Sequence, residues 1–263
     1  MKTALLTVIT FLSASFRLSP ESAPTISIAD MEQNNLPVNQ QIVEYTSDTE
    51  IKPAKVTSAS IKWWGYPETI LQATRSGDDL LVLVNKEYKL PSTYVPSDLV
   101  LASNAGIRKG EGFYLRNILI NDLRDMINAA TADSIDLSMV SGYRSYNTQI
   151  GTYNYWVGIN GVDGADKISA RAGHSQHQLG TAIDFSSSEV ADGLGGSFRY
   201  TRAAAWLAEN SWRYGFVISY PSGYEPVTGY SYESWHYRYI GISNAKEMHD
   251  SGMILELYLR SKN

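Results

Sequence analysis

Apolar residues are distributed unevenly along the 263-residue chain, and they separate a polar N-terminal segment from a segment able to form a core. Residues 16 to about 60 are rich in Ser, Thr, Pro, Glu, Asn and Gln, and their scattered apolar residues follow no lasting period. Such a composition buries too little apolar surface to fold by itself. Large apolar residues become dense from the stretch SIKWWGYP onward. We therefore expect an N-terminal extension or linker over residues 16–75 and one folded domain over residues 76–263.

Two long apolar stretches in the first half of this domain predict a strand and a helix. The stretch DDLLVLVNKEYKL (78–90) contains a continuous apolar run typical of a buried strand, and two prolines follow it. The stretch GFYLRNILINDLRDMINAATA (112–132) predicts an amphipathic helix, because apolar residues recur in it at three-and-four spacing. These residues are Leu115, Ile118, Leu119, Leu123, Met126 and Ile127.

Shorter patterns complete the predicted order of elements. The stretch IDLSMVSGYRS (135–145) indicates a short strand, RAAAWLAENSWRYGF (202–216) a second helix, and SWHYRYIGI (234–242) another strand. The C-terminal stretch NAKEMHDSGMILELYL predicts a helix broken near Gly252. Strands and helices do not alternate as they do in a doubly wound sheet. We therefore predict an α+β fold with an antiparallel sheet core and flanking helices.

The first fifteen residues, MKTALLTVITFLSAS, have the layout of a secretory signal peptide. A positive charge at Lys2 precedes an apolar run from Ala4 to Leu12, and small residues follow. The alternative is a buried N-terminal helix. No other segment approaches 18 uninterrupted apolar residues, so we expect no transmembrane anchor in the mature chain. These features predict export to the bacterial periplasm, cell wall or extracellular space.

Composition excludes several classes of function. A net charge of -5 argues against a nucleic-acid binder, because phosphate contacts require a basic surface. The chain has no cysteine, so it has no disulfide, no thiolate metal ligand and no cysteine nucleophile. A monomer is the favoured oligomeric state.

The stretch RAGHSQHQLGTAIDF (171–185) contains two of the four histidines of the chain and one aspartate. Gly180 separates His177 from TAIDF, which reads as an apolar strand. In an extended strand Ala182 and Asp184 share one face. An acid within such a strand is costly to bury unless it is paired or bound to a cation. These residues alone leave two interpretations open, namely a metal ligand and a capping or salt-bridged aspartate.

A second stretch, YESWHYRY, favours the metal site. His236 would join His177 and Asp184 as two imidazoles and one carboxylate, a normal ligand set for catalytic zinc with one position left for water. Glu233 would then be the general base. Its odd offset from His236 places it on the opposite face of a regular strand. The hypothesis therefore requires Glu233 to lie in the preceding loop or at a bulge.

These stretches resemble the signatures of a known family. SQHQLGTAID matches the pattern Ser-x-His-x-x-Gly-x-Ala-x-Asp of the bacterial zinc D,D-peptidases, and ESWH matches their Glu-x-x-His. LVNKEYKLPSTYVPSDLV (83–100) and SGYRSYNTQ (141–149) are also similar to segments of that family. The chain thus resembles the VanY-like D-alanyl-D-alanine carboxypeptidases of the M15 peptidases, over roughly residues 80–262. The resemblance implies a zinc site of the type that Hedgehog proteins and D,D-peptidases share.

The resemblance also implies a role for each matched residue. His177, Asp184 and His236 would bind one Zn²⁺ per chain, and Glu233 would be the catalytic base. Arg144 would face the carbonyl or carboxylate of the substrate, and Ser175 and Gln149 would lie near the substrate. His174 stands where many relatives carry a tyrosine.

The implied reaction is removal of the terminal D-alanine from peptidoglycan stem peptides by metal-activated water. Three other activities on the same zinc core stay open: D,D-dipeptidase, L,D-carboxypeptidase and endopeptidase. A non-catalytic module that binds cell-wall peptides is a further alternative, and the presence of Glu233 argues against it.

Overall fold

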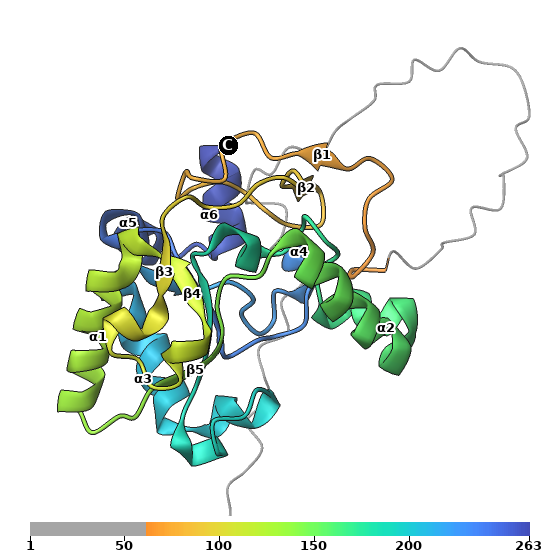
Figure 1. Cartoon of the computed structure of the whole chain (residues 1–263). Coiled ribbons are helices and arrows are strands. Elements are labelled where there is room, and N and C mark those ends of the chain that lie inside the picture. The colour runs from red at the N-terminus through yellow and green to blue at the C-terminus, as the bar shows by residue number, and fades with distance from the viewer. Residues whose placement is uncertain (1–61) are drawn as a thin grey trace, which may run out of the picture. The chain divides into compact units, whose positions relative to one another are not determined.

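The computed structural model describes residues 62–263. The predicted signal peptide and residues 16–61 of the predicted extension lie outside this part of the chain. The described strands are short: β1 Leu71–Gln72, β2 Tyr88–Lys89, β3 Leu99–Leu101, β4 Tyr114–Arg116, β5 Ser138–Ser141, β6 Ala182–Ser186, β7 Phe216–Ile218 and β8 His236–Tyr239. The α-helices are α1 Ile120–Ala132, α2 Tyr146–Ile168, α3 Arg202–Asn210, α4 Glu225–Thr228, α5 Ile242–Ser251 and α6 Leu255–Lys262 (Figure 1).

A four-stranded antiparallel sheet lies at the centre of the described residues. Its strand order is β5-β6-β8-β7, so strands distant in the sequence are neighbours. Asp184 of β6 is directly opposite His236 of β8. On the other side of β6, the register with β5 shifts between Met139 and Ser141, and this irregularity brings Ser141 opposite Asp184.

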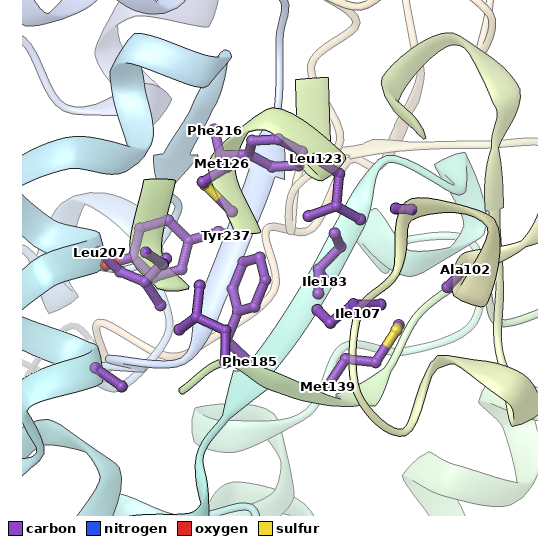
Figure 2. Close-up of a cluster of buried hydrophobic side chains, with 14 of the residues drawn as sticks. Ala102, Ile107, Leu123, Met126, Met139, Ile183, Phe185, Leu207, Phe216 and Tyr237 are labelled. Carbon is purple, nitrogen blue, oxygen red and sulfur yellow. The ribbon is translucent and has the colours of Figure 1, made fainter. Parts of the chain in front are cut away.

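One face of the sheet forms the main hydrophobic core. Ile183 and Phe185 of β6 point into it together with Tyr237 of β8 (Figure 2). Leu123 of α1 and Leu207 of α3 pack against them from the helices that cover this face. The alternation of TAIDF thus places its large apolar side chains on the core face, as the sequence predicts.

A second apolar cluster lies on the opposite side of β7 and β8. Val217 and Ile240 contact buried residues of the two C-terminal helices, such as Met248 of α5 and Leu259 of α6. Both faces of the central strands are therefore covered by apolar packing, and the polar site described below occupies part of the second face.

The structure confirms the predicted fold class, an α+β arrangement on an antiparallel sheet. It also confirms the strands within 135–145 and 234–242 and the break near Gly252, which separates α5 from α6. The helix predicted over 202–216 consists of α3 followed by a 3-10 helix over Ser211–Tyr214. Gly215 ends it in the left-handed region, with φ of 86°.

The helix predicted over 112–132 is too long at its N-terminal end. Residues 114–116 form β4, a 3-10 helix spans Asn117–Leu119, and α1 begins only at Ile120. Leu115 is fully buried, but it is buried from a strand paired with β3. Burial of Leu115 is therefore compatible with the apolar spacing, but Leu115 lies in β4 and not in the helix.

The strand predicted over 78–90 is also wrong, because only Tyr88 and Lys89 are in a strand. Val82 and Val84 are buried as expected, but their segment has no ladder partner. Part of its backbone is bound instead by Arg238 of β8, whose Nη2 donates to the carbonyls of Leu80 at 3.0 Å and Val82 at 2.7 Å. A buried guanidinium thus satisfies carbonyls that a neighbouring strand would otherwise bind.

Helix α2 has no counterpart among the predicted elements. In its sequence, YNTQIGTYNYWVGINGVDGADKI, several apolar residues are exposed, among them Tyr155, Ile159 and Val162. Only Gln149, Ala165 and Asp166 are buried in it, and Gly161 interrupts it with φ of 67° and ψ of 173°. An apolar period cannot identify such a helix, because little of it contacts the core.

Residues 62–75, which the sequence assigns to the extension, make specific contacts with the rest of the described chain. The backbone N–H of Arg171 donates to the Tyr66 hydroxyl at 2.8 Å, and β1 pairs with β2. Lys86 Nζ lies 4.4 Å from the centre of the Tyr66 ring and 4.2 Å from that of Tyr230. Among residues 62–263, no helix is both long and apolar enough to span a membrane.

Candidate active site

A row of polar side chains crosses the sheet at the level of Asp184. Ser141, Asp184 and His236 are opposite one another on β5, β6 and β8. Asp184 and His236 are buried, with 4% and 3% of their surfaces exposed. Cross-strand pairing therefore fixes the distance between the aspartate and one of the two histidines.

His177 reaches this row from a 3-10 helix, Gln176–Leu179, that precedes β6. The Ser175 hydroxyl accepts a hydrogen bond from the backbone N–H of His177 and caps the start of this helix. Gly180 ends it with φ of 69°, a conformation that glycine adopts without strain. The turn brings the His177 ring to 4.9 Å from the His236 ring, measured between centroids.

Each imidazole has one nitrogen near a protein oxygen and the other nitrogen near Asp184. His177 Nδ1–H donates to the Gly142 carbonyl at 2.7 Å, and His236 Nε2–H donates to Gln176 Oε1 at 3.1 Å. When each neutral imidazole carries its one proton on these nitrogen atoms, the other nitrogen of each ring has a lone pair. His177 Nε2 lies 3.2 Å from Asp184 Oδ2, and His236 Nδ1 lies 2.9 Å from Oδ1.

Three electron-pair donors therefore converge on one point. The ligand atoms of His177, Asp184 and His236 all lie within 4.8 Å of one another. Two lone pairs that face a carboxylate repel it unless a cation lies between them. Two imidazoles and one carboxylate are also a common protein ligand set of catalytic zinc. These residues fit a metal ion, and the hydrogen bonds behind both histidines are of the kind that orients metal ligands.

Glu233 lies in the loop that leads into β8, as the hypothesis of a general base requires. Its backbone N–H donates to the Tyr220 carbonyl, and its own carbonyl accepts from the backbone N–H of His236. Its Oε2 lies 3.8 Å from His236 Nδ1, and 13% of its side chain is exposed. The carboxylate is thus beside the ligand cluster without belonging to it.

Arg144 follows β5 and is held in place by two hydrogen bonds. Its Nη1 donates to Gln149 Oε1 and its Nη2 to the Ser141 hydroxyl, both at 2.9 Å. Its backbone N–H donates to the carbonyl of His177. The guanidinium thereby becomes part of the cavity wall that also contains Asp184 and Glu233.

Gln149 and Ser175, the two other residues that the sequence places near the substrate, are in the same wall, but both form hydrogen bonds within the protein. Gln149 is 1% exposed, accepts from Arg144 and donates through Nε2 to the Ala170 carbonyl at 2.6 Å. Ser175 is 4% exposed and accepts from His177. Their side chains line the cavity while supporting Arg144 and His177 respectively.

The ligand cluster lies in a cavity of about 860 Å³. Helix α2 forms one wall with Thr148, Thr152 and Trp156, and the loop after β6 and the segment between β7 and β8 form other parts of it. Several aromatic residues complete the wall: Tyr155, Tyr220, Tyr230, Tyr232 and Trp235. A cavity of this size holds a ligand as large as a short peptide.

Burial and charge shift the pKa values of the ionisable groups in the cavity. Burial raises the pKa of Glu233 well above its usual range, and the Asp184 charge raises it further while Arg144 opposes both. Burial lowers the pKa of His177, which keeps its ring neutral and able to bind a metal.

The other two histidines are not part of the cluster. His174 Nδ1 bonds the Asn85 carbonyl, and its ring contacts Tyr66 edge-on. His249 is on the exposed part of α5 and stacks on Trp212 at 3.9 Å between centroids. His174 therefore lies outside the ligand cluster.

Sequence reasoning missed the α2 wall and Gln176. Apart from Gln149, the α2 residues that line the cavity are not among the candidate residues of the sequence, and their part in the cavity follows only from the path of the chain after Arg144. Gln176 lies within the SQH stretch, but its contacts are with Ser219 and His236, which are 43 and 60 residues away. A sequence pattern gives no sign of such distant partners.

Comparisons with known proteins agree with this geometry. The family model VanY, described as D-alanyl-D-alanine carboxypeptidase, matches residues 112–242. YodJ of Bacillus subtilis is 37% identical over 190 residues, which is 72% of this chain and 70% of YodJ.

Solved structures give the same result. The LD-carboxypeptidase LdcB matches with a TM-score of 0.64 and 36% identity, over 70% of this chain and 87% of LdcB. A mutant of the D,D-pentapeptidase VanY from a VanB-type resistance cassette, solved with Zn(II), matches with a TM-score of 0.58 and 30% identity. That match covers 70% of this chain and 99% of the VanY chain. The chain therefore belongs to the VanY family of D-alanyl-D-alanine carboxypeptidases and is a metallopeptidase.

Proposed function

We propose that the protein is a zinc-dependent carboxypeptidase that removes the terminal D-alanine from peptidoglycan stem peptides. The observation that carries the proposal is the convergence of His177, Asp184 and His236 beside Glu233 in a cavity large enough for a peptide. His177 Nε2, an Asp184 carboxylate oxygen and His236 Nδ1 would hold the zinc ion. When bound, zinc supplies Lewis acidity toward a peptide carbonyl and makes water more acidic.

Glu233 has the position and environment of a general base. Its carboxylate would accept the proton of the attacking water and deliver it to the nitrogen of the departing D-alanine. The raised pKa of Glu233 suits this second step, because a weaker acid group retains the proton until the amine leaves. No side chain needs to form a covalent bond to the substrate.

Arg144 would bind the substrate through charge. The two hydrogen bonds to Gln149 and Ser141 fix its guanidinium without neutralising it, so it can attract a carbonyl oxygen or the C-terminal carboxylate. We propose that Gln149 acts by holding Arg144, and Ser175 by holding His177, rather than through contacts of their own.

The substrate class implies where the enzyme works. Peptidoglycan lies outside the cytoplasmic membrane, so the proposal includes export of the chain, for which the signal-like sequence MKTALLTVITFLSAS is suited. Residues 62–75 would belong to the folded unit, and the linker would end before them.

Digestion of purified muropeptides tests the proposed reaction. Zinc-loaded protein should convert a pentapeptide ending in D-Ala-D-Ala to the tetrapeptide, with release of one alanine detected by mass spectrometry. Release of the dipeptide D-Ala-D-Ala, or cleavage within a cross-link, would contradict the proposal. A chain that binds these peptides without cutting them would indicate a binding module instead.

A second candidate activity is that of an L,D-carboxypeptidase. It is favoured by the match to LdcB, which has both a higher TM-score and a higher identity than the match to VanY. The two activities differ in the substrate residue before the scissile bond, which is D-alanine in one case and an L-amino acid in the other. Parallel assays on matched penta- and tetrapeptides separate them, because only an L,D-enzyme shortens the tetrapeptide.

A further inference from the structure

Gln176 connects the metal-site histidine of β8 to the helix that carries the other histidine. It is the first residue of the 3-10 helix Gln176–Leu179, and it is 4% exposed. Its side-chain oxygen, Oε1, accepts a hydrogen bond from His236 Nε2–H at 3.1 Å. The same oxygen accepts from the Ser219 hydroxyl at 2.7 Å.

These contacts bear on which nitrogen of His236 carries the proton. A proton on Nε2 leaves the Nδ1 lone pair free, and Nδ1 is the atom that faces the ligand cluster. In the other tautomer, Nδ1–H would donate to Asp184 Oδ1, which lies only 2.9 Å away. That bond would occupy both an imidazole ligand atom and a carboxylate ligand atom at once.

The tautomer that binds a metal therefore needs an acceptor at Nε2 to compete with the Asp184 carboxylate. Gln176 Oε1 is the acceptor that the structure provides there. The Ser219 hydroxyl donates to the same oxygen, so the amide is fixed with its oxygen toward the histidine. Ser219 is itself placed by the sheet, since its backbone N–H donates to the His236 carbonyl.

We propose that Gln176 is a positioning residue that holds His236 in the Nε2–H tautomer and thereby increases the affinity of the site for zinc. The inference rests on the proposed function, because it takes His177, Asp184 and His236 as the zinc ligands. Gln176 acts on the metal only through His236. A neutral amide does this without adding a third carboxylate to a site that already contains Asp184 and Glu233.

The chain offers a closely matched control for this role. Gln178 lies two residues further along the same 3-10 helix and is fully buried. Its Nε2 donates to the carbonyls of Pro91 and Tyr94, at 3.0 and 3.1 Å, away from the ligand cluster. Gln178→Met and Gln176→Met thus remove the same groups from the same helix, but only the second removes the acceptor of His236.

Zinc affinity of the full chain provides the main test, measured by competition with a chromogenic chelator. Gln176→Met should weaken zinc binding by about 10- to 100-fold, the usual effect of losing a partner behind a metal ligand. Gln176→Glu keeps an acceptor at the same place and should bind at least as tightly as the wild type. Gln178→Met should lower the stability of the metal-free chain but leave its zinc affinity within about threefold.

Three results would overturn the proposal: unchanged affinity in Gln176→Met, an equal loss in Gln178→Met, or an equal loss in Gln176→Glu. Nitrogen-15 NMR of the metal-free chain gives a readout that packing alone does not change. His236 should carry its proton on Nε2 in the wild type and on Nδ1 in Gln176→Met, and Nδ1–H in the wild type would contradict the inference.

Failure of the proposed function would look different. A wild-type chain that binds zinc but releases no alanine contradicts the carboxypeptidase activity and leaves the affinity comparison valid. An active enzyme in which Gln176→Met binds zinc normally contradicts only the role of Gln176.

Discussion

The Glu233 carboxylate is almost buried and also lies beside a proposed metal ligand. Its Oε2 lies 3.8 Å from Nδ1 of this ligand, His236. Burial without a strong ion pair raises the pKa of the Glu233 carboxyl. The residue is thereby suited to carry a proton between two steps of one reaction.

Glu233→Gln should separate binding from turnover. The amide has nearly the same shape but cannot accept the proton of water, so kcat should fall by roughly 10²- to 10⁴-fold. Zinc content and peptide affinity should stay near those of the wild type, as measured by metal analysis and by calorimetry with the intact pentapeptide. Glu225→Gln, a substitution in α4 outside the ligand cluster, serves as the control and should keep full activity. Undiminished hydrolysis by Glu233→Gln would refute its role.

At the residue scale, the structure brings together the three side chains that the sequence proposes as ligands. The alternation in TAIDF places Asp184 opposite to Ile183 and Phe185, and the required position of Glu233 before the strand is the one observed. The resemblance supplied the set of candidate residues. The tautomers and the supporting contacts of Gly142 and Gln176 could not be predicted, because they depend on atoms brought together by folding.

Arg238 connects two elements that have no common backbone ladder. It is fully buried on β8, and burial lowers its pKa to about 10. Its bonds to the Leu80 and Val82 carbonyls attach the segment before β2 to the sheet. The sequence predicts a strand here because the apolar run indicates burial. It does not indicate that a side chain, Arg238, binds the backbone carbonyls in place of a neighbouring strand.

Arg238→Met should therefore destabilise the fold. One buried and one partly buried carbonyl would lose their donor, at a cost of up to about 1–3 kcal/mol each, while removal of a buried charge offsets part of that cost. We expect a net loss of about 2 kcal/mol in the free energy of unfolding, measured by urea denaturation. The exposed Arg213→Met is the control and should change the free energy by less than about 0.5 kcal/mol. Equal stability of Arg238→Met and the wild type would show that the two bonds contribute nothing.

The loop between β6 and α3 is held by charge. Arg108 bonds both Asp136 and Asp192, at 2.7 and 2.6 Å, and Ala191 and Asp192 both have positive φ. The loop continues to Leu194 and Gly195, which line the cavity. An ion-pair network thus stabilises a strained segment at the edge of the site.

This network should contribute to stability at neutral pH and lose its contribution in acid. The hydrogen bonds of Arg108 outweigh the opposite effect of burial and lower the pKa of Asp136 from 3.8 to about 2. Its contribution is therefore complete above pH 3.8 and is lost as the pH falls toward 2. Because 42% of the side chain is exposed, we expect only about 1 kcal/mol. Comparison of Asp136→Asn with the wild type should show a stability difference at neutral pH that disappears in this window; a constant difference would contradict it.

On the scale of the whole molecule, zinc should stabilise the fold, because its proposed ligands come from separate elements that meet only in the native state. A ligand at 100 times its Kd adds about 2.7 kcal/mol, which corresponds to an increase in Tm of roughly 5–10 °C for a domain of this size. Removal of zinc with a chelator should lower the Tm of the wild type by that amount. His236→Ala should have a Tm that does not respond to the chelator; a response equal to that of the wild type would exclude His236 as a ligand.

Residues 62–75 should be needed for a stable fold. A chain beginning at residue 76 lacks Tyr66, which binds the Arg171 backbone and covers Lys86. It should unfold at a lower temperature than a chain beginning at residue 62, as measured by differential scanning calorimetry. The substitution Tyr66→Leu in the longer chain should reproduce part of the loss. Equal Tm values for the two chains would place the boundary at residue 76, where sequence composition suggests it.

The pairing of Asp184 with His236 makes the spacing of these two proposed ligands independent of the length of the chain between them. The two residues are 52 positions apart, yet the ladder between β6 and β8 alone determines their spacing. Insertions or deletions between them would leave the chemistry in place while reshaping the cavity wall, which includes Leu194, Tyr220 and Tyr232. A library that varies loop length only within residues 187–195 and 221–232 should consequently yield proteins that still bind zinc but differ in the peptides they accept.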